Sequence, residues 1–129
     1  MTPFLDAAQS FTFYCGPPRS GAPFHEHTSA WNACVYGYKR WALLPPCAAL
    51  TTRAHSSHWL SNGAGEGEGG GPPQGALEFV QGPGEVVFVP PHWTHAVLNL
   101  TDVVGVASEF AAHAYPPDLP PPRRKEAPP

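Results

Sequence analysis

Short runs of apolar and β-branched residues, rather than helical periodicity, dominate the pattern of this chain. Only residues 46–58 leave room for a short helical turn, because no longer stretch shows apolar positions at i, i+3 and i+4. Many short strands joined by short links are typical of an antiparallel sandwich or barrel. The runs that predict strands are residues 11–15, 23–27, 33–38, 40–44, 76–81, 85–90, 95–100 and 103–110.

Two segments interrupt or follow the strand pattern and define the expected domain organisation. Residues 63–75 read GAGEGEGGGPPQG, which cannot bury enough apolar surface to offset the entropy of ordering it, so we expect a disordered, flexible insertion. Residues 113–129 form a Pro-rich tail, either a solvated extension or a ligand for a PxxP-binding domain or a localisation signal. The prediction is one domain over residues 1–112, followed by this tail.

Composition and charge exclude several classes of protein. The chain has 129 residues, of which 13% are charged, and a formal net charge of −3. No apolar run approaches the ~20 residues of a membrane-spanning helix, and the first residues do not resemble a signal peptide. Basic residues before the tail are too few to follow a phosphate backbone, so we expect no direct nucleic-acid binding. Three cysteines without CxxC spacing favour free thiols in a reducing compartment, cytoplasmic or nuclear.

Three histidines form the candidate metal site. His25 and His27 are two residues apart on an expected strand, so both imidazoles point to one face. His95 opens a later strand and is the best candidate for a third ligand. Glu26 would join them only if a bulge rotated its strand. The alternative is that these histidines are core residues that bind no metal.

The surroundings of His95 resemble a known family. Gly84, Pro90, His95 and Asn99 follow the spacing of the second cupin motif, with His92 at a position where that motif has Gly. Residues 21–46, GAPFHEHTSAWNACVYGYKRWALLPP, resemble the Jumonji-C (JmjC) domain, a cupin-type double-stranded β-helix. They are most similar to the JmjC branch regarded as lysyl hydroxylases, which has a Gly-x-Lys-Arg-Trp run before a Pro-Pro pair. The resemblance covers about residues 11–112.

This resemblance implies an all-β fold and an Fe(II)- and 2-oxoglutarate-dependent oxygenase that hydroxylates or demethylates a protein or small molecule. His25 and His95 match the family's iron-binding histidines, whereas His27 stands where most active members have Asp or Glu. Lys39 matches the lysine that pairs with the far carboxylate of the cosubstrate 2-oxoglutarate. Asn32 matches an asparagine near the cosubstrate. Iron is thus expected on His25, His27 and His95.

Departures from the family leave other functions open. Three neutral imidazoles suit Zn, Cu and Ni as well as Fe, and Glu109 lies where relatives have an Asn-containing strand. One alternative is a catalytically silent JmjC-like module that binds a partner protein. Another is a three-histidine metal cupin that does not use 2-oxoglutarate. None of these patterns indicates an oligomeric state.

Overall fold

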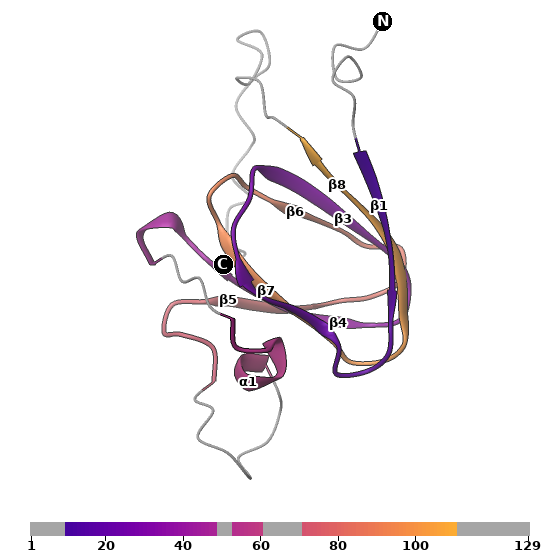
Figure 1. Ribbon diagram of the computed structural model, residues 1–129, viewed down its shortest axis with the longest axis horizontal. Helices are drawn as coiled ribbons and strands as arrows, with labels where there is room; N and C mark the ends of the chain where they lie inside the picture. The colour runs from indigo at the N-terminus through magenta and orange to yellow at the C-terminus, as the bar shows by residue number, and fades with distance from the viewer. Residues whose placement is uncertain (1–9, 49–52, 61–70, 111–129) are drawn as a thin grey trace, which may run out of the picture.

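Two four-stranded antiparallel sheets face each other in the computed structural model, which describes residues 10–48, 53–60 and 71–110 (Figure 1). Sheet A has the strand order β1-β8-β3-β6, and sheet B has the order β2-β7-β4-β5. The strands are β1 (Ser10–Gly16), β2 (Gly21–His25), β3 (Ser29–Tyr36), β4 (Lys39–Leu44), β5 (Leu77–Gln81), β6 (Val86–Val89), β7 (Thr94–Asn99) and β8 (Val103–Phe110). Apart from the step from β4 to β5, successive strands alternate between the sheets, which confirms the expected double-stranded β-helix.

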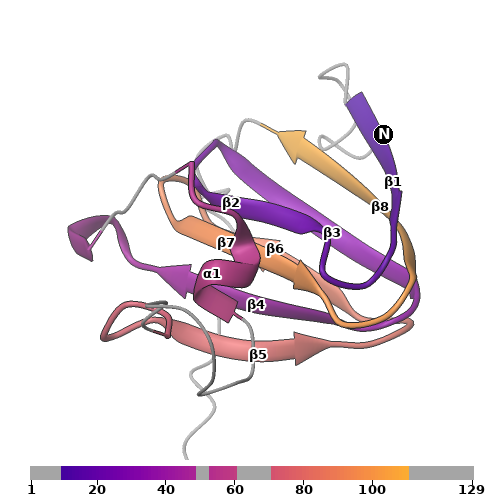
Figure 2. The same cartoon turned by 60° about the horizontal axis from the view of Figure 1, so that its bottom comes forward.

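Two apolar clusters hold the sheets in place. One lies between the sheets, and the other lies on the outer side of sheet B beneath the helix α1 (Ser56–Leu60) (Figure 2). The first consists of Ala30, Trp41, Leu43, Val89 and Val97, with Val87 and Trp93 packed against it. The second consists of Phe24, Ala42, Leu44, Leu60, Ala96 and Leu98, with Trp59 and Ala76 packed against it.

The expected strands are present in their expected order, but some bounds differ. β2 ends at His25, so His27 lies in the link to β3 rather than on the strand. Pro23 lies inside a register shift between Ala22 and His25, and proline cannot donate to the strand ladder. β3 begins at Ser29 rather than at residue 33, because its first residues pair with β8 and most of them also with β6. Such long-range partners leave no mark on the local sequence.

Outside the sheets, the expected short helical turn is a 3-10 helix at Pro46–Ala48, and α1 follows at residues 56–60. Residues 71–75 of the expected insertion lead into β5 through a turn, in which the Ala76 amide donates to the Pro73 carbonyl at 3.1 Å. Residues 63–70 and the tail 113–129 lie outside the described residues. The cysteines are free, as expected. In the described ranges no helix has the length and apolar character needed to cross a membrane.

Candidate metal centre and its pocket

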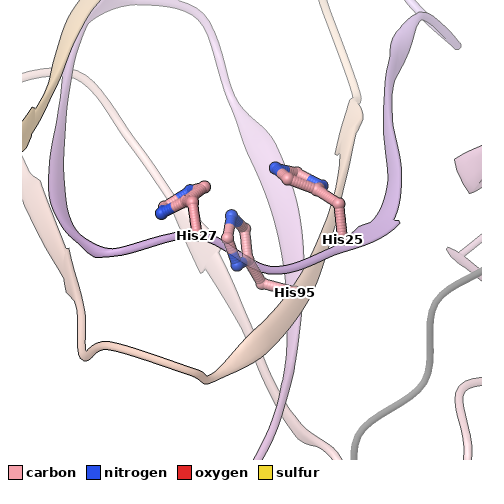
Figure 3. Close-up of side chains that lie close together, drawn as sticks. All are labelled: His25, His27 and His95. Carbon is pink, nitrogen blue, oxygen red and sulfur yellow. The ribbon is translucent and has the colours of Figure 1, made fainter.

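Three histidines meet at one end of the two facing sheets (Figure 3). His25 ends β2 and pairs with His95 on β7, while His27 reaches them from the link after β2. One ligand nitrogen from each residue lies within 4.8 Å of the other two. The ring centroids are 4.2 Å apart for His25 and His95 and 4.6 Å for His27 and His95. The fold therefore brings all three predicted ligands together, although His27 arrives from a loop.

Backbone carbonyls fix the orientation of each imidazole. Nδ1 of His25 lies 2.7 Å from the Pro23 carbonyl, Nδ1 of His27 lies 2.7 Å from that of Thr28, and Nδ1 of His95 lies 3.1 Å from that of Trp93. A carbonyl oxygen only accepts, so each Nδ1 carries the proton and donates. Every Nε2 then presents a free lone pair, which is how metal-binding histidines are usually held.

The electrostatics of the cluster favour a neutral His95. The pKa of His95 is lowered to about 4, mainly by burial and to a smaller degree by the neighbouring His25 and His27, while the hydrogen bond to the Trp93 carbonyl acts in the opposite direction. His95 also stacks on Trp41, with ring centroids 6.0 Å apart. Glu26 is exposed and does not belong to the cluster found among the described residues. Within the described ranges, the candidate donor set is three imidazoles without a carboxylate.

A pocket of about 620 Å³ adjoins the histidines, and it is lined by both sheets. Lys39 and Asn32 line the same pocket. On sheet B, Lys39 pairs with Asn99 whereas His95 pairs with Leu43. Four residues of strand, or roughly 13 Å, therefore separate the position of Lys39 along β4 from the level of His95. The pocket has a candidate metal centre at one end and a lysine at the other.

Lys39 is a buried cation, and no carboxylate in the described part of the chain forms an ion pair with it. The residue is 4% exposed, and its Nζ donates to Oδ1 of Asn32 at 3.1 Å and lies 3.8 Å from the centroid of the Tyr14 ring. Burial lowers the pKa of Lys39 to about 8, although the nearby Cys34 opposes this effect. The neighbouring Arg40 faces away and pairs with Glu78 at 2.7 Å. Of these two adjacent cations, only Lys39 faces the pocket.

Tyr14 is a pocket residue that the sequence reasoning missed. Its hydroxyl donates to Oδ1 of Asn32 at 2.7 Å, and burial raises its pKa to about 12. Gly105 pairs with Tyr14 across β1 and β8, and a Cβ at Gly105 would collide with the Tyr14 hydroxyl. Alternation along β1 puts Tyr14 on the face opposite Phe11 and Phe13. The alternation of side chains along β1 was the feature of the sequence that could have identified Tyr14 as a pocket residue.

Gln81 holds the pocket wall together across the two sheets. Its amide nitrogen donates to the carbonyls of Asn32 at 2.8 Å and Glu85 at 3.0 Å, and its Oε1 accepts from Nε1 of Trp41 at 3.0 Å. Asn99 of the second motif donates to Oγ of Ser20 at 2.9 Å. It thereby fastens the loop between β1 and β2.

Two residues that depart from the family motifs, Glu109 and His92, lie near the rim of the pocket. Glu109 lines the pocket with an exposed side chain. His92 is exposed and has a φ of 64°, the left-handed conformation that explains why Gly is usual there. Its amide donates to the His27 carbonyl at 3.3 Å. The turn before β7 therefore contacts the link that carries His27.

Comparison with solved structures shows the class of fold. The chain resembles oxalate decarboxylase from Bacillus subtilis with a TM-score of 0.52 and 12% sequence identity, over 85% of this chain and 23% of that chain. Together with the strand order, this likeness defines a cupin-type β-helix.

The sequence comparisons add the family. Residues 74–110 match the family model described as JmjC domain, hydroxylase. Relatives include the bifunctional arginine demethylase and lysyl-hydroxylase psr-1 of Caenorhabditis elegans, 34% identical over 116 residues, and the 2-oxoglutarate and iron-dependent oxygenase JMJD4 of Homo sapiens, 32% identical over 124 residues. These matches cover 78% and 79% of this chain but only 29% and 27% of the relatives. They confirm the resemblance to the JmjC family.

Proposed function

We propose that this chain is an Fe(II)- and 2-oxoglutarate-dependent oxygenase domain that hydroxylates or demethylates a protein or small-molecule substrate. The observation that carries the proposal is the pocket with three convergent imidazoles at one end and the buried ammonium group of Lys39 at the other. The names of the JmjC relatives support the same kind of chemistry.

The three histidines fit a divalent first-row metal ion. Each offers Nε2 with its Nδ1 already committed to a backbone carbonyl. Iron sites of this class ordinarily combine two histidines with a carboxylate, so the third imidazole leaves more of the ion's charge uncompensated. When bound together with 2-oxoglutarate, iron would activate dioxygen, the oxidant that hydroxylates a C–H bond while 2-oxoglutarate is converted to succinate and CO2.

The chain's own residues would bind and orient the cosubstrate. Lys39 would hold the far carboxylate of 2-oxoglutarate by a charge-assisted hydrogen bond, which is strong where water is excluded. Asn32 and Tyr14 hold the ammonium group in place before any ligand arrives. Trp41 and Val97 would keep water from the space between lysine and metal centre, since both line the pocket and are buried.

Metal content and succinate release test this function on the full chain. We expect iron to be retained after reconstitution with Fe(II), and we expect succinate to form from 2-oxoglutarate. Lys39→Met should weaken 2-oxoglutarate binding, whereas Arg40→Met, the matched control on the outer face, should not. Wild-type protein that binds no iron and releases no succinate would overturn the proposal.

A second candidate is a three-histidine metal cupin that does not use 2-oxoglutarate. The observation in its favour is that Glu26 stays outside the cluster and leaves three neutral donors, which suit Zn, Cu and Ni as well as Fe. Metal retention without measurable 2-oxoglutarate affinity would identify this function. A catalytically silent module that binds a partner would show neither metal nor cosubstrate binding.

A further inference from the structure

The amine of Lys39 faces the pocket without a carboxylate partner among the described residues. Lys39 lines the pocket of about 620 Å³ and is only 4% exposed. Its Nζ donates a hydrogen bond to Oδ1 of Asn32 at 3.1 Å, and no ion pair in the described ranges involves it. An amide oxygen is neutral, so this bond fixes the position of the nitrogen without the negative charge that would keep it protonated.

Two aromatic rings enclose this nitrogen. Nζ of Lys39 lies 3.8 Å from the centroid of the Tyr14 ring and 5.2 Å from that of the Trp41 ring. The Tyr14 hydroxyl donates to the same Oδ1 atom of Asn32, so the surroundings of the amine are held together before any ligand arrives. Burial lowers the pKa of Lys39 to about 8, and a larger share of the amine is therefore neutral near pH 7 than in an exposed lysine. A neutral amine that faces a cavity is a nucleophile.

We propose that Lys39 is a carbonyl-reactive site that holds a small uncharged aldehyde as an imine. The ammonium group first gives a proton to solvent, and the lone pair of Nζ then attacks the carbonyl carbon. A C–N bond forms, the carbonyl oxygen becomes a hydroxyl group, and loss of water breaks the C–O bond and leaves C=N. The protonated imine is again a cation, so Asn32 and the two rings hold it as they hold the ammonium. This chemistry needs neither a metal ion nor 2-oxoglutarate, and it therefore goes beyond the proposed oxygenase function.

Charge and polarity select the class of ligand. A carboxylate beside Nζ would favour the ammonium form, which has no lone pair, so an aldehyde that carried a carboxylate next to the reacting carbon would suppress its own reaction. A cationic aldehyde would add a second unpaired positive charge to a buried site. Trp41 and Val97 line the pocket and are buried, and they give a hydrocarbon group an apolar wall to pack against. The site therefore favours an uncharged aldehyde with a short apolar group.

Reductive alkylation of the full chain tests this proposal. Acetaldehyde is the probe, and cyanoborohydride reduces the imine to a stable secondary amine. The chain has two lysines, Lys39 and Lys125, so mass spectrometry of peptides gives the rate at each one. In native protein treated with a chelator, we expect Lys39 to be ethylated at least about tenfold faster than Lys125. In urea the two rates should be similar, because the low pKa of Lys39 depends on the fold. Native labelling of Lys39 that is equal to or slower than that of Lys125 would overturn the proposal.

Two variants at Asn32 separate the reactivity of Lys39 from its accessibility. Asn32→Asp keeps the shape of the side chain but places a carboxylate at hydrogen-bond distance from Nζ, so ethylation of Lys39 should fall about tenfold or more. Asn32→Leu, which has a similar size but adds no charge, should not slow the reaction. Far-UV circular dichroism checks that each variant is folded before labelling. Rates at Lys39 that are equal in the two folded variants would overturn the proposal, because charge would then have no effect on the reaction.

Discussion

At the scale of single residues, His27 gives the candidate metal centre an imidazole where most active JmjC members have a carboxylate. Three neutral donors leave the charge of a divalent ion uncompensated. We therefore expect His27→Asp to raise Fe(II) retention by about tenfold or more, since a unit-charge pair at 4 Å is worth about 4 kcal/mol even at an effective dielectric constant near 20. Turnover of 2-oxoglutarate to succinate should rise with it.

His27→Asn is the matched control, because it also shortens the side chain but adds no charge. Iron stoichiometry and succinate, measured side by side in wild type and both variants, check the expectation. Equal iron retention in the Asp and Asn variants would show that ligand charge does not limit the site.

Lys39 gives the second prediction at this scale, through pH. Because its pKa is lowered to about 8, the free protein loses this charge as pH rises through 8. A bound carboxylate favours the charged form, so 2-oxoglutarate binding should take up a proton near pH ~9, and its affinity should fall up to tenfold per pH unit above 8. Calorimetry in buffers of different ionisation enthalpy measures this uptake.

Lys39→Arg supplies the control for the binding experiment, because a guanidinium stays protonated throughout this range. A 2-oxoglutarate affinity of the wild type that does not change with pH across this range would contradict the role of Lys39 in binding the carboxylate.

The lowered pKa of Lys39 also affects the stability of the fold. Between about pH 8 and 10.5 Lys39 is protonated in the unfolded chain but not in the folded one, so its contribution to stability rises with pH there, whereas the raised pKa values of Cys34 and Tyr14 act in the opposite direction above about pH 9.

Local sequence predicted some of these residues better than others. His95 and Lys39 lie in motifs with fixed spacing, so their positions could be read directly. His27 could be read as a ligand but not as a loop residue, because the end of β2 depends on pairing with β7. Tyr14 carries no motif, and its role depends on the space that Gly105 leaves on a strand distant in sequence.

At the scale of elements, the turn between β6 and β7 carries measurable strain. His92 adopts a φ of 64°, and a side chain in this conformation costs about 1–2 kcal/mol that glycine does not pay. His92→Gly should stabilise the fold by about 0.5–1 kcal/mol, since the greater freedom of glycine when unfolded offsets part of the gain. Urea unfolding measures the change, and His92→Ala, which keeps a Cβ, should show no such gain.

The strands were easier to predict than the elements that cover them. Alternating and β-branched runs mark each strand, so the eight strands of the two sheets were expected in order. The helix α1 has only five residues, too few to show helical periodicity. It forms because Leu60 is buried against sheet B, and the sequence around Leu60 does not predict that contact.

At the scale of the whole molecule, the three candidate metal ligands come from parts of the chain that are far apart in sequence. His25 and His27 precede β3, whereas His95 lies on β7. A metal ion would therefore bind the folded chain and not the unfolded one, and each tenfold excess over the dissociation constant should add about 1.4 kcal/mol of stability. We expect added Fe(II) or Zn(II) to raise the thermal midpoint of the wild type and to leave His95→Ala unchanged. A midpoint that does not respond in the wild type would mean that the cluster binds no ion.

Each imidazole at the metal centre takes its orientation from a carbonyl one or two residues away, on Pro23, Thr28 or Trp93. Two short segments of backbone therefore set the orientation of the three imidazoles, and the pocket wall contributes little to it. Substitutions at Thr12, Ala107 or Glu109 can reshape what enters the pocket while the three nitrogens stay aimed at the same point. In an enzyme of the proposed kind, one substrate could therefore be exchanged for another without a change in the candidate metal centre.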